Sequence, residues 1–252
     1  MGIGSRSYAR PYTMGGGLPQ GIKLLLIANV AVFLLQTFGL GGPLLNYFAL
    51  RPAALADSLA IWQLASYMFL HGGIWHILFN MLALWMFGRE LEEMWGTRNF
   101  LRFYFFTGIG AGVCIVLVNY LFGNPNSITI GASGAIYGIM LASAIYWPDR
   151  IVYMQMLFPI KMKYFVMIYG AIAFLGSTNM NSGVSDIGHL GGLLCGYIYL
   201  RSPLGSTRNR RRGPGLLETA RQSYKTWRFE RNKRRFQVYM KKHGSDRNPP
   251  VN

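Results

Sequence analysis

Long apolar runs, separated by short polar or charged stretches, occupy most of the chain up to about residue 200. Apolar runs with so few charges predict helices that cross a membrane, because a helix satisfies its own backbone hydrogen bonds in lipid. The pattern predicts six such helices, at about Ile22–Leu40, Ile74–Gly88, Phe100–Phe122, Ile130–Trp147, Tyr164–Gly176 and Asp186–Leu200. The run Arg89–Glu93 is predicted to be a charged turn after the second helix, and Pro148–Lys163 a connection after the fourth.

The first connection, Gly41–Leu70, differs from an ordinary solvated loop. It contains Pro43 and Pro52, yet it also carries an apolar and aromatic patch that includes Trp62 and Tyr67. Aromatic side chains are favoured where lipid meets water. We therefore expect a partly helical segment that lies in the interface or dips into the membrane.

Basic residues are distributed unevenly between the two sides that six spans would define. If both chain ends and the connections after the second and fourth spans share one side, that side holds 24 of the 25 lysines and arginines. The other side holds only Arg51. Because an excess of basic residues marks the cytoplasmic side, both ends of the chain are predicted to be cytoplasmic.

The composition agrees with this pattern. Hydrophobic residues make up 52% of the chain and charged residues only 13%, whereas a soluble domain carries about 25% charged residues. The predicted fold class is therefore an all-α membrane protein, a bundle of six transmembrane helices. We divide the chain into a short N-terminal segment (1–21), the membrane bundle (22–201) and a basic tail (202–252).

The tail is a different kind of sequence. Between Arg208 and Arg247 it has 14 basic residues against three acidic ones, with apolar residues at helical spacing. One or two helices are expected, and the favoured interpretation is a solvated tail attracted to anionic lipid headgroups. Nucleic-acid binding is not favoured, because a basic tail beside a membrane already follows from the topology rule. A helix that binds a partner protein is a further alternative.

Polar and ionisable residues inside spans are costly and thus candidates for function. Those singled out are His76 and Asn80 in the second span, Ser133 in the fourth, and His189 in the sixth with Asp186 just before it. All lie in the first turns of spans that run from outside to inside. The topology therefore predicts that they lie at a similar depth, near the outer leaflet.

Small residues indicate which helices meet. Gly134 and Gly138 mark the fourth span, and Gly188, Gly192 and Gly196 mark the sixth. Facing stripes of this kind let two backbones approach closely, so a contact between the serine and the histidine at their outer ends is expected. Imidazole could then act as the base that activates the hydroxyl.

The remaining polar residues fit an oxyanion site. His76 and Asn80 are four residues apart and share a helical face. Their side chains could donate hydrogen bonds to an oxyanion beside the Ser133 N–H at the start of a helix. Gly131, before this serine, would allow the tight turn that exposes it.

Each of these residues also has a purely structural interpretation. Glycines around a serine can serve helix packing alone, and His76 and Asn80 can simply bond across helices. Asp186 is expected to cap its helix rather than complete a triad. A metal site built from His71, His76 and His189 is not expected, since no His-Glu-x-x-His motif is present, and no cofactor is implied. His71 is expected to fix the loop by hydrogen bonding.

Three motifs together resemble those of the rhomboid intramembrane serine proteases. They are His71-x4-His76-x3-Asn80, Gly131-Ala132-Ser133-Gly134 and Gly188-His189-x2-Gly192-x3-Gly196, on the second, fourth and sixth spans. The resemblance covers about Ile22–Leu200. Trp62-Gln63 stands where the family often has Trp-Arg, and Gly188 stands where alanine is common.

The resemblance implies roles for the motif residues. Ser133 would be the nucleophile and His189 the general base, a dyad without an acid. His76, Asn80 and the Ser133 amide would form the oxyanion hole, Tyr137 would stack on the His189 ring, and Gly131 and Gly134 would support the serine. The turn Ser177–Ser185 would be a flexible cap over the dyad.

The expected function is that of an intramembrane serine endopeptidase of the six-span bacterial type, in the bacterial inner membrane. Its substrates would be membrane proteins cut within or beside a transmembrane helix. The alternative is a catalytically silent protein of the same fold that binds transmembrane helices as a chaperone or trafficking factor. Silent relatives usually lack the serine or the histidine, and this chain has both.

Overall fold

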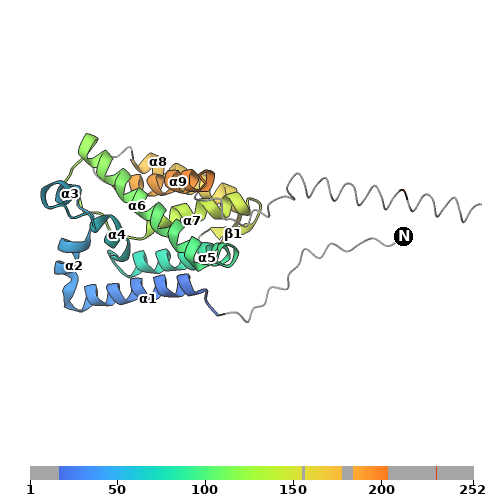
Figure 1. Cartoon of the computed structure of the whole chain (residues 1–252), viewed down its shortest axis with the longest axis horizontal. Helices are drawn as coiled ribbons and strands as arrows, with labels where there is room; N and C mark the ends of the chain where they lie inside the picture. Colours follow the sequence, from blue (N-terminus) through green and yellow to red (C-terminus); the bar gives the residue numbers. More distant parts are fainter. Residues whose placement is uncertain (1–16, 155–156, 178–183, 204–230, 232–252) are drawn as a thin grey trace, which may run out of the picture. The chain divides into compact units, whose positions relative to one another are not determined.

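The computed structural model describes residues 17–154, 157–177, 184–203 and 231. Most of the predicted N-terminal segment and nearly all of the basic tail lie outside these residues, as does most of the predicted cap. The described part of residues 1–207 forms one compact unit, built mainly of helices (Figure 1).

All six apolar runs form helices, as the sequence predicts. They are α1 (Gln20–Leu35), α5 (Ile74–Trp95), α6 (Thr97–Phe122), α7 (Ser133–Tyr146), α8 (Met162–Ser177) and α9 (Val184–Arg201). Within the described ranges, two helical stretches are long and apolar enough to cross a membrane, Gln20–Phe48 and Thr97–Phe122. A third qualifies if Gln63–Phe69 and Ile74–Trp95, bent by 100°, count as one span. Length and composition alone thus support two or three spans.

Large apolar side chains cover much of the outer surface of these helices. Their exposed fractions are typical of a surface that faces lipid rather than water. Examples are Leu24 (53% exposed), Ile27 (55%), Leu117 (55%), Leu121 (69%) and Ile172 (57%). The helices are therefore those of a membrane protein.

The first connection is partly helical, as predicted. After α1 the chain passes through a π-helical turn, Gln36–Leu40, where Gly39 has a φ of 107° that breaks the regular helix. It continues through α2 (Gly41–Phe48), α3 (Pro52–Ser58), α4 (Gln63–Ser66) and a short 3-10 helix, η2 (Tyr67–Phe69). Figure 1 shows α2, α3 and α4 together at one end of the helical bundle.

The predicted charged turn after the second span is wrong, because α5 continues through it to Trp95. Arg89 and Glu93, one turn apart, form an ion pair of 2.9 Å along the helix surface. Glu92 points inward and is 3% exposed. Its carboxylate accepts hydrogen bonds from the backbone N–H groups of Gly21 (2.7 Å) and Ile22 (2.8 Å), so it caps the start of α1.

The connection after α7 contains a β-hairpin that the apolar pattern does not predict. Strands β1 (Ile151–Met154) and β2 (Phe158–Lys161) pair antiparallel. Asp149, just before the hairpin, accepts hydrogen bonds from Lys163 (3.0 Å) and Lys161 (3.2 Å). These two lysines, Lys163 more strongly, hold the pKa of Asp149 below its usual value. Figure 1 shows β1 at the end of the bundle opposite α2 and α3.

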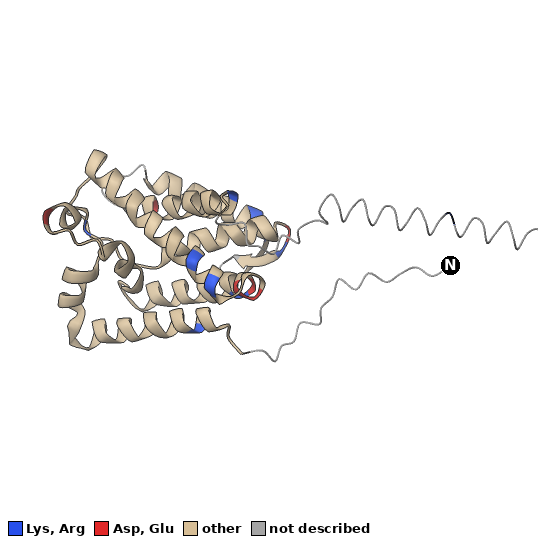
Figure 2. Cartoon of the chain, viewed as in Figure 1, with Lys and Arg blue, Asp and Glu red and all other residues tan. Residues whose placement is uncertain are grey.

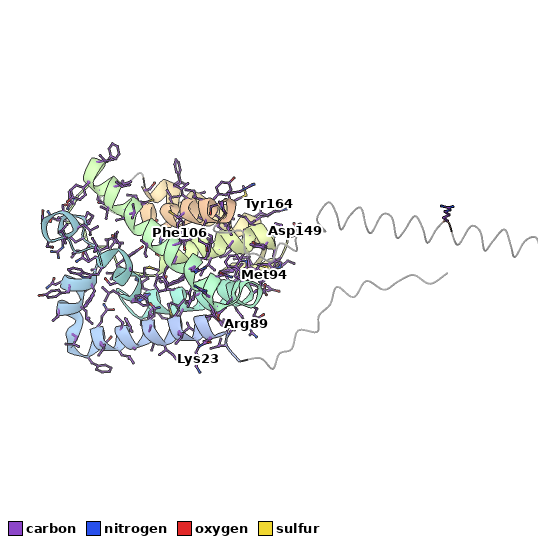
Figure 3. All side chains as sticks on the ribbon, viewed as in Figure 1. Lys23, Arg89, Met94, Phe106, Asp149 and Tyr164 are labelled. Carbon is purple, nitrogen blue, oxygen red and sulfur yellow. The ribbon has the colours of Figure 1, made fainter. Side chains whose placement is uncertain are left out.

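Charged residues gather near this same end. Figure 2 shows most of the blue and red ribbon segments of the described part on the hairpin side of the bundle. The labelled side chains of Lys23, Arg89 and Asp149 lie there in Figure 3. The middle of the bundle is nearly free of charge, as expected for helices immersed in lipid.

Helix α7 lies at the centre of the bundle, in contact with α5, α6, α8 and α9. The two predicted glycine stripes face each other. A Cβ on Gly192 would overlap the backbone of Gly134, 2.8 Å from its carbonyl carbon. A Cβ on Gly196 would lie 3.1 Å from the Cα of Gly138. Helices α7 and α9 therefore pack backbone against backbone.

Candidate active site

A short extended segment leads into α7 and is held by the first connection. Leu50 and Thr129 exchange two backbone hydrogen bonds of 3.0 and 2.9 Å, and the N–H of Gly131 donates to the carbonyl of Tyr67 (2.9 Å). Gly131 then turns the chain with a φ of 118°, a conformation that other residues rarely adopt. The turn places Ser133 at the first position of α7.

The side chains of Ser133 and His189 are in contact. The Oγ of Ser133 lies 2.9 Å from Nε2 of His189, although the two residues are 56 positions apart in the chain. The glycine packing of α7 on α9 explains this short distance, because both residues lie at the ends of the facing stripes. The contact joins a hydroxyl to a possible general base.

Tyr137 fixes the plane of this imidazole ring. It lies one turn after Ser133 on α7, and its ring stacks on that of His189 with centroids 4.2 Å apart and planes 5° apart. The stack leaves Nε2 of His189 directed at the serine. On the other edge of the ring, Nδ1 faces the carboxylate of Asp186 at 3.5 Å.

His76 reaches the same site from the start of α5. The N–H of Gly72 donates to its Nδ1 (3.2 Å), which assigns the ring proton to Nε2. A Cβ at position 131 would lie 2.8 Å from this Nε2 and 4.0 Å from the Oγ of Ser133. Nε2 of His76 and Oγ of Ser133 thus both border the space that a side chain at position 131 would fill.

Asn80 lies one turn further along α5 and is 7% exposed. Its Nδ2 donates to the carbonyl of His76 at 2.7 Å, which leaves the second N–H of the amide for another acceptor. Asn29 and Asn119 make the same bond to a carbonyl four residues earlier in α1 and α6. This backbone bond therefore does not distinguish Asn80 from a structural asparagine, and its oxyanion role stays a prediction.

His71 fixes the loop through its backbone rather than its ring. The side chain of Gln36 accepts from the N–H of His71 (3.0 Å) and donates to its carbonyl (3.3 Å), which ties the loop to the π-helical turn after α1. The ring packs edge-on against His76, with centroids 5.1 Å apart. In the described ranges, no three His, Cys, Asp or Glu residues are grouped closely enough to hold a metal ion.

A small cavity adjoins the serine. Its volume of about 10 Å³ corresponds to a single water molecule. The cavity is lined by residues of η2, α6, the loop before α7, and the starts of α7 and α9. These residues are Tyr67, Ile115, Thr129, Ile130, Gly131, Ser133, Gly134 and Gly188. The space around Ser133 is therefore narrow, and backbone contributes much of its wall.

Residues 58–202 match the family model of the Rhomboid domain. The chain belongs to the rhomboid family. It is 30% identical over 196 residues to rhomboid protease AarA of Providencia stuartii, an alignment that covers 69% of each chain. It is also 34% identical over 139 residues to rhomboid protease GluP of Bacillus subtilis, covering 54% of this chain and 25% of that protein.

A plant protein is similar as well. RHOMBOID-like protein 4 of Arabidopsis thaliana is 30% identical over 162 residues, 61% of this chain and 38% of the plant protein. The chain thus spans well under half the length of this relative and of GluP.

Sequence reasoning missed several polar residues that the bundle buries. Asn29, Thr107, Asn119 and Glu92 are all at most 3% exposed. For Asn29, Thr107 and Asn119 the available signal was a polar residue inside an apolar run, whereas Glu92 lies in the charged run 89–93 and gave no such signal. Another missed residue is Gly176 of α8, which borders the carboxylate of Asp186. The role of Gly176 could not be predicted from the sequence, because it depends on which helix packs beside α9.

Proposed function

We propose that this rhomboid is an intramembrane serine endopeptidase that uses Ser133 as nucleophile and His189 as general base. The observation that carries the proposal is the 2.9 Å contact between Ser133 Oγ and His189 Nε2. The two groups come from different helices, and the ring is held by the Tyr137 stack. The names of AarA and GluP as rhomboid proteases support the same activity.

The chemistry follows from this arrangement. As the Oγ of Ser133 attacks the substrate carbonyl, its proton passes to Nε2 of His189. The oxyanion accepts hydrogen bonds from the Ser133 N–H, from Nε2–H of His76 and from the second N–H of Asn80. His189 then gives its proton to the leaving amine. Water hydrolyses the acyl-enzyme by the same steps, with His189 as base.

The length of α7 bears on how the site meets water. Its 14 residues span about 21 Å at 1.5 Å per residue, less than the ~30 Å hydrocarbon core. If its end near Trp147 lies at the inner boundary, the serine lies roughly 9 Å below the outer one. We propose that water reaches Ser133 from that outer face.

The proposed substrates are membrane proteins with a transmembrane helix. A helical backbone resists attack because its carbonyls are hydrogen-bonded, so the substrate must unwind at the cut. Glycine, proline or other small and polar residues near the scissile bond favour unwinding. A substrate series that differs only in these positions tests this, and equal rates across the series would refute it.

We also propose that α1, α5, α6, α7, α8 and α9 all cross the membrane, with both chain ends cytoplasmic. The gathering of charge at the hairpin end supports this orientation (Figure 2). The orientation is tested by placing cysteines at Ser127 and at Ser202 and labelling them in intact cells with a membrane-impermeant thiol reagent. Labelling at position 202 rather than 127 would contradict the orientation.

For the basic tail we propose contact with anionic headgroups, testable by salt-sensitive binding of a 208–252 peptide to anionic vesicles.

The experiment for the nucleophile is labelling of the full chain with a serine-reactive fluorophosphonate probe. The wild-type chain should be labelled and Ser133→Ala should not. Equal labelling of both would refute the proposal. Failure to label the folded wild type would favour the silent, helix-binding alternative.

A further inference from the structure

The carboxylate of Asp186 faces the second nitrogen of the His189 ring. Its Oδ1 lies 3.5 Å from Nδ1, and the two residues are three positions apart in the first turns of α9. That spacing places them on one face of the helix. The separation is longer than a formed hydrogen bond, but catalytic hydrogen bonds often tighten only when substrate binds.

Gly176 of α8 makes room for this carboxylate. A Cβ at position 176 would overlap Oδ2 of Asp186 and lie 2.6 Å from its Cγ. Any other residue at 176 would therefore displace the acid from where it lies. The carboxylate thus lies between the backbone of α8 and the imidazole ring, with 26% of the side chain exposed. An acid that only stabilised the start of α9 would need no such space in a neighbouring helix.

The other contacts of the ring leave Nδ1 for this acid. Nε2 of His189 contacts the Oγ of Ser133, and one ring face is covered by Tyr137. Nδ1 is buried and has no hydrogen-bond partner elsewhere in the residues described. For Nε2 to take the serine proton, Nδ1 must carry the ring hydrogen. A carboxylate at Nδ1 favours that tautomer and stabilises the imidazolium that forms.

We propose that Asp186 is a positioning residue for His189, whose carboxylate holds the ring of the Ser133–His189 dyad in the Nδ1–H tautomer. This inference rests on the proposed function. In the acylation step the serine proton moves to Nε2, Nδ1 keeps its hydrogen, and the carboxylate stays ionised throughout. Gly176 has the complementary role of keeping the acid beside the ring.

The test compares Asp186→Asn with Asp186→Glu and with Asp57→Asn in the full chain. Asp57 is an exposed acid on α3, so its variant controls for the same chemical change away from the site. We expect Asp186→Asn to lower kcat by about 10- to 100-fold with little change in KM, less than the ~10⁴-fold loss for the buried triad acid of a soluble protease. Asp186→Glu should recover part of the rate. The thermal midpoint should match that of Asp57→Asn.

A second variant and a spectroscopic readout separate positioning from folding. Gly176→Ala keeps the acid but pushes it away, and should lower kcat as Asp186→Asn does. Nitrogen NMR of ¹⁵N-histidine should show His189 protonated at Nδ1 in the wild type, and a shift toward the Nε2–H tautomer in Asp186→Asn. A kcat for Asp186→Asn within twofold of Asp57→Asn, or an unchanged tautomer, would overturn this positioning role. Ser133→Ala separates the two proposals, because its inactivity supports the proposed function whatever Asp186 does.

Discussion

Gly192 of α9 rests on the backbone of Gly134 in α7, so closely that a Cβ at position 192 would lie 2.8 Å from the Gly134 carbonyl carbon. Gly134 directly follows Ser133, and Gly192 lies three residues after His189. The packing of these helices and the geometry of the proposed catalytic pair therefore depend on the same contact.

Gly192→Ala should inactivate the protein more than it unfolds it. The new methyl group must move α9 away from α7, and a displacement of about 1 Å at a catalytic pair can cost ~10²-fold in rate. Substrate cleavage and the thermal midpoint measure the two effects. Gly42→Ala is the control, because a Cβ there meets nothing within 4 Å. A Gly192→Ala variant with the wild-type rate would contradict the role of this contact.

Gly131→Ala should also reduce turnover, for a different reason. The φ of 118° is strained for alanine, and its Cβ would lie 2.8 Å from Nε2 of His76. The variant should therefore displace His76 and lower kcat by about 10-fold or more. Gly72→Ala serves as the matched control, since its Cβ would stay 3.7 Å from Nδ1 of the same histidine. If both variants lose activity equally, the close approach of position 131 to His76 is not the cause of the loss.

Replacing either proposed oxyanion donor should lower kcat by about 10²-fold while the protein stays folded. The variants are His76→Ala and Asn80→Ala, measured by steady-state cleavage. Asn29→Ala is the matched control for Asn80, because it removes the same kind of side-chain bond to a carbonyl four residues earlier. The control should affect stability and leave kcat unchanged. Unchanged turnover in both donor variants would refute the oxyanion role.

Glu92→Gln should destabilise the bundle without changing the catalytic residues. The buried carboxylate accepts from two N–H groups at the start of α1 and from Oγ1 of Thr97 (2.6 Å). Losing its charge should cost about 1–3 kcal/mol of unfolding free energy. Glu93→Gln, one residue on, removes a half-exposed ion pair with Arg89 and should cost less than ~1 kcal/mol. Unfolding in mild detergent compares them, and equal costs would contradict the capping role.

The pattern of apolar residues was sufficient to predict the six main helices. Each of the six runs is a helix, and the glycine stripes of α7 and α9 face each other because small residues allow the closest approach. The contact of Ser133 with His189 was expected from their places at the outer ends of these stripes. Their catalytic roles stay predictions.

Features that depend on distant partners could not be predicted from local pattern. The charged run 89–93 was predicted to be a turn, yet α5 continues through it, and Glu92 caps the start of α1 about 70 residues away in the sequence. The break at Gly39 and the β-hairpin arise from backbone geometry that hydropathy does not record. The space that Gly176 leaves for Asp186 depends on the packing of α8 beside α9.

The most direct test of the account is cleavage of a model single-span membrane protein by the purified full chain in lipid vesicles. The wild type should cut the substrate within or beside its transmembrane helix. Ser133→Ala and His189→Ala should each fold with near wild-type stability and show no cleavage. Cleavage by a folded Ser133→Ala variant at the wild-type rate would contradict the central claim that this serine is the nucleophile.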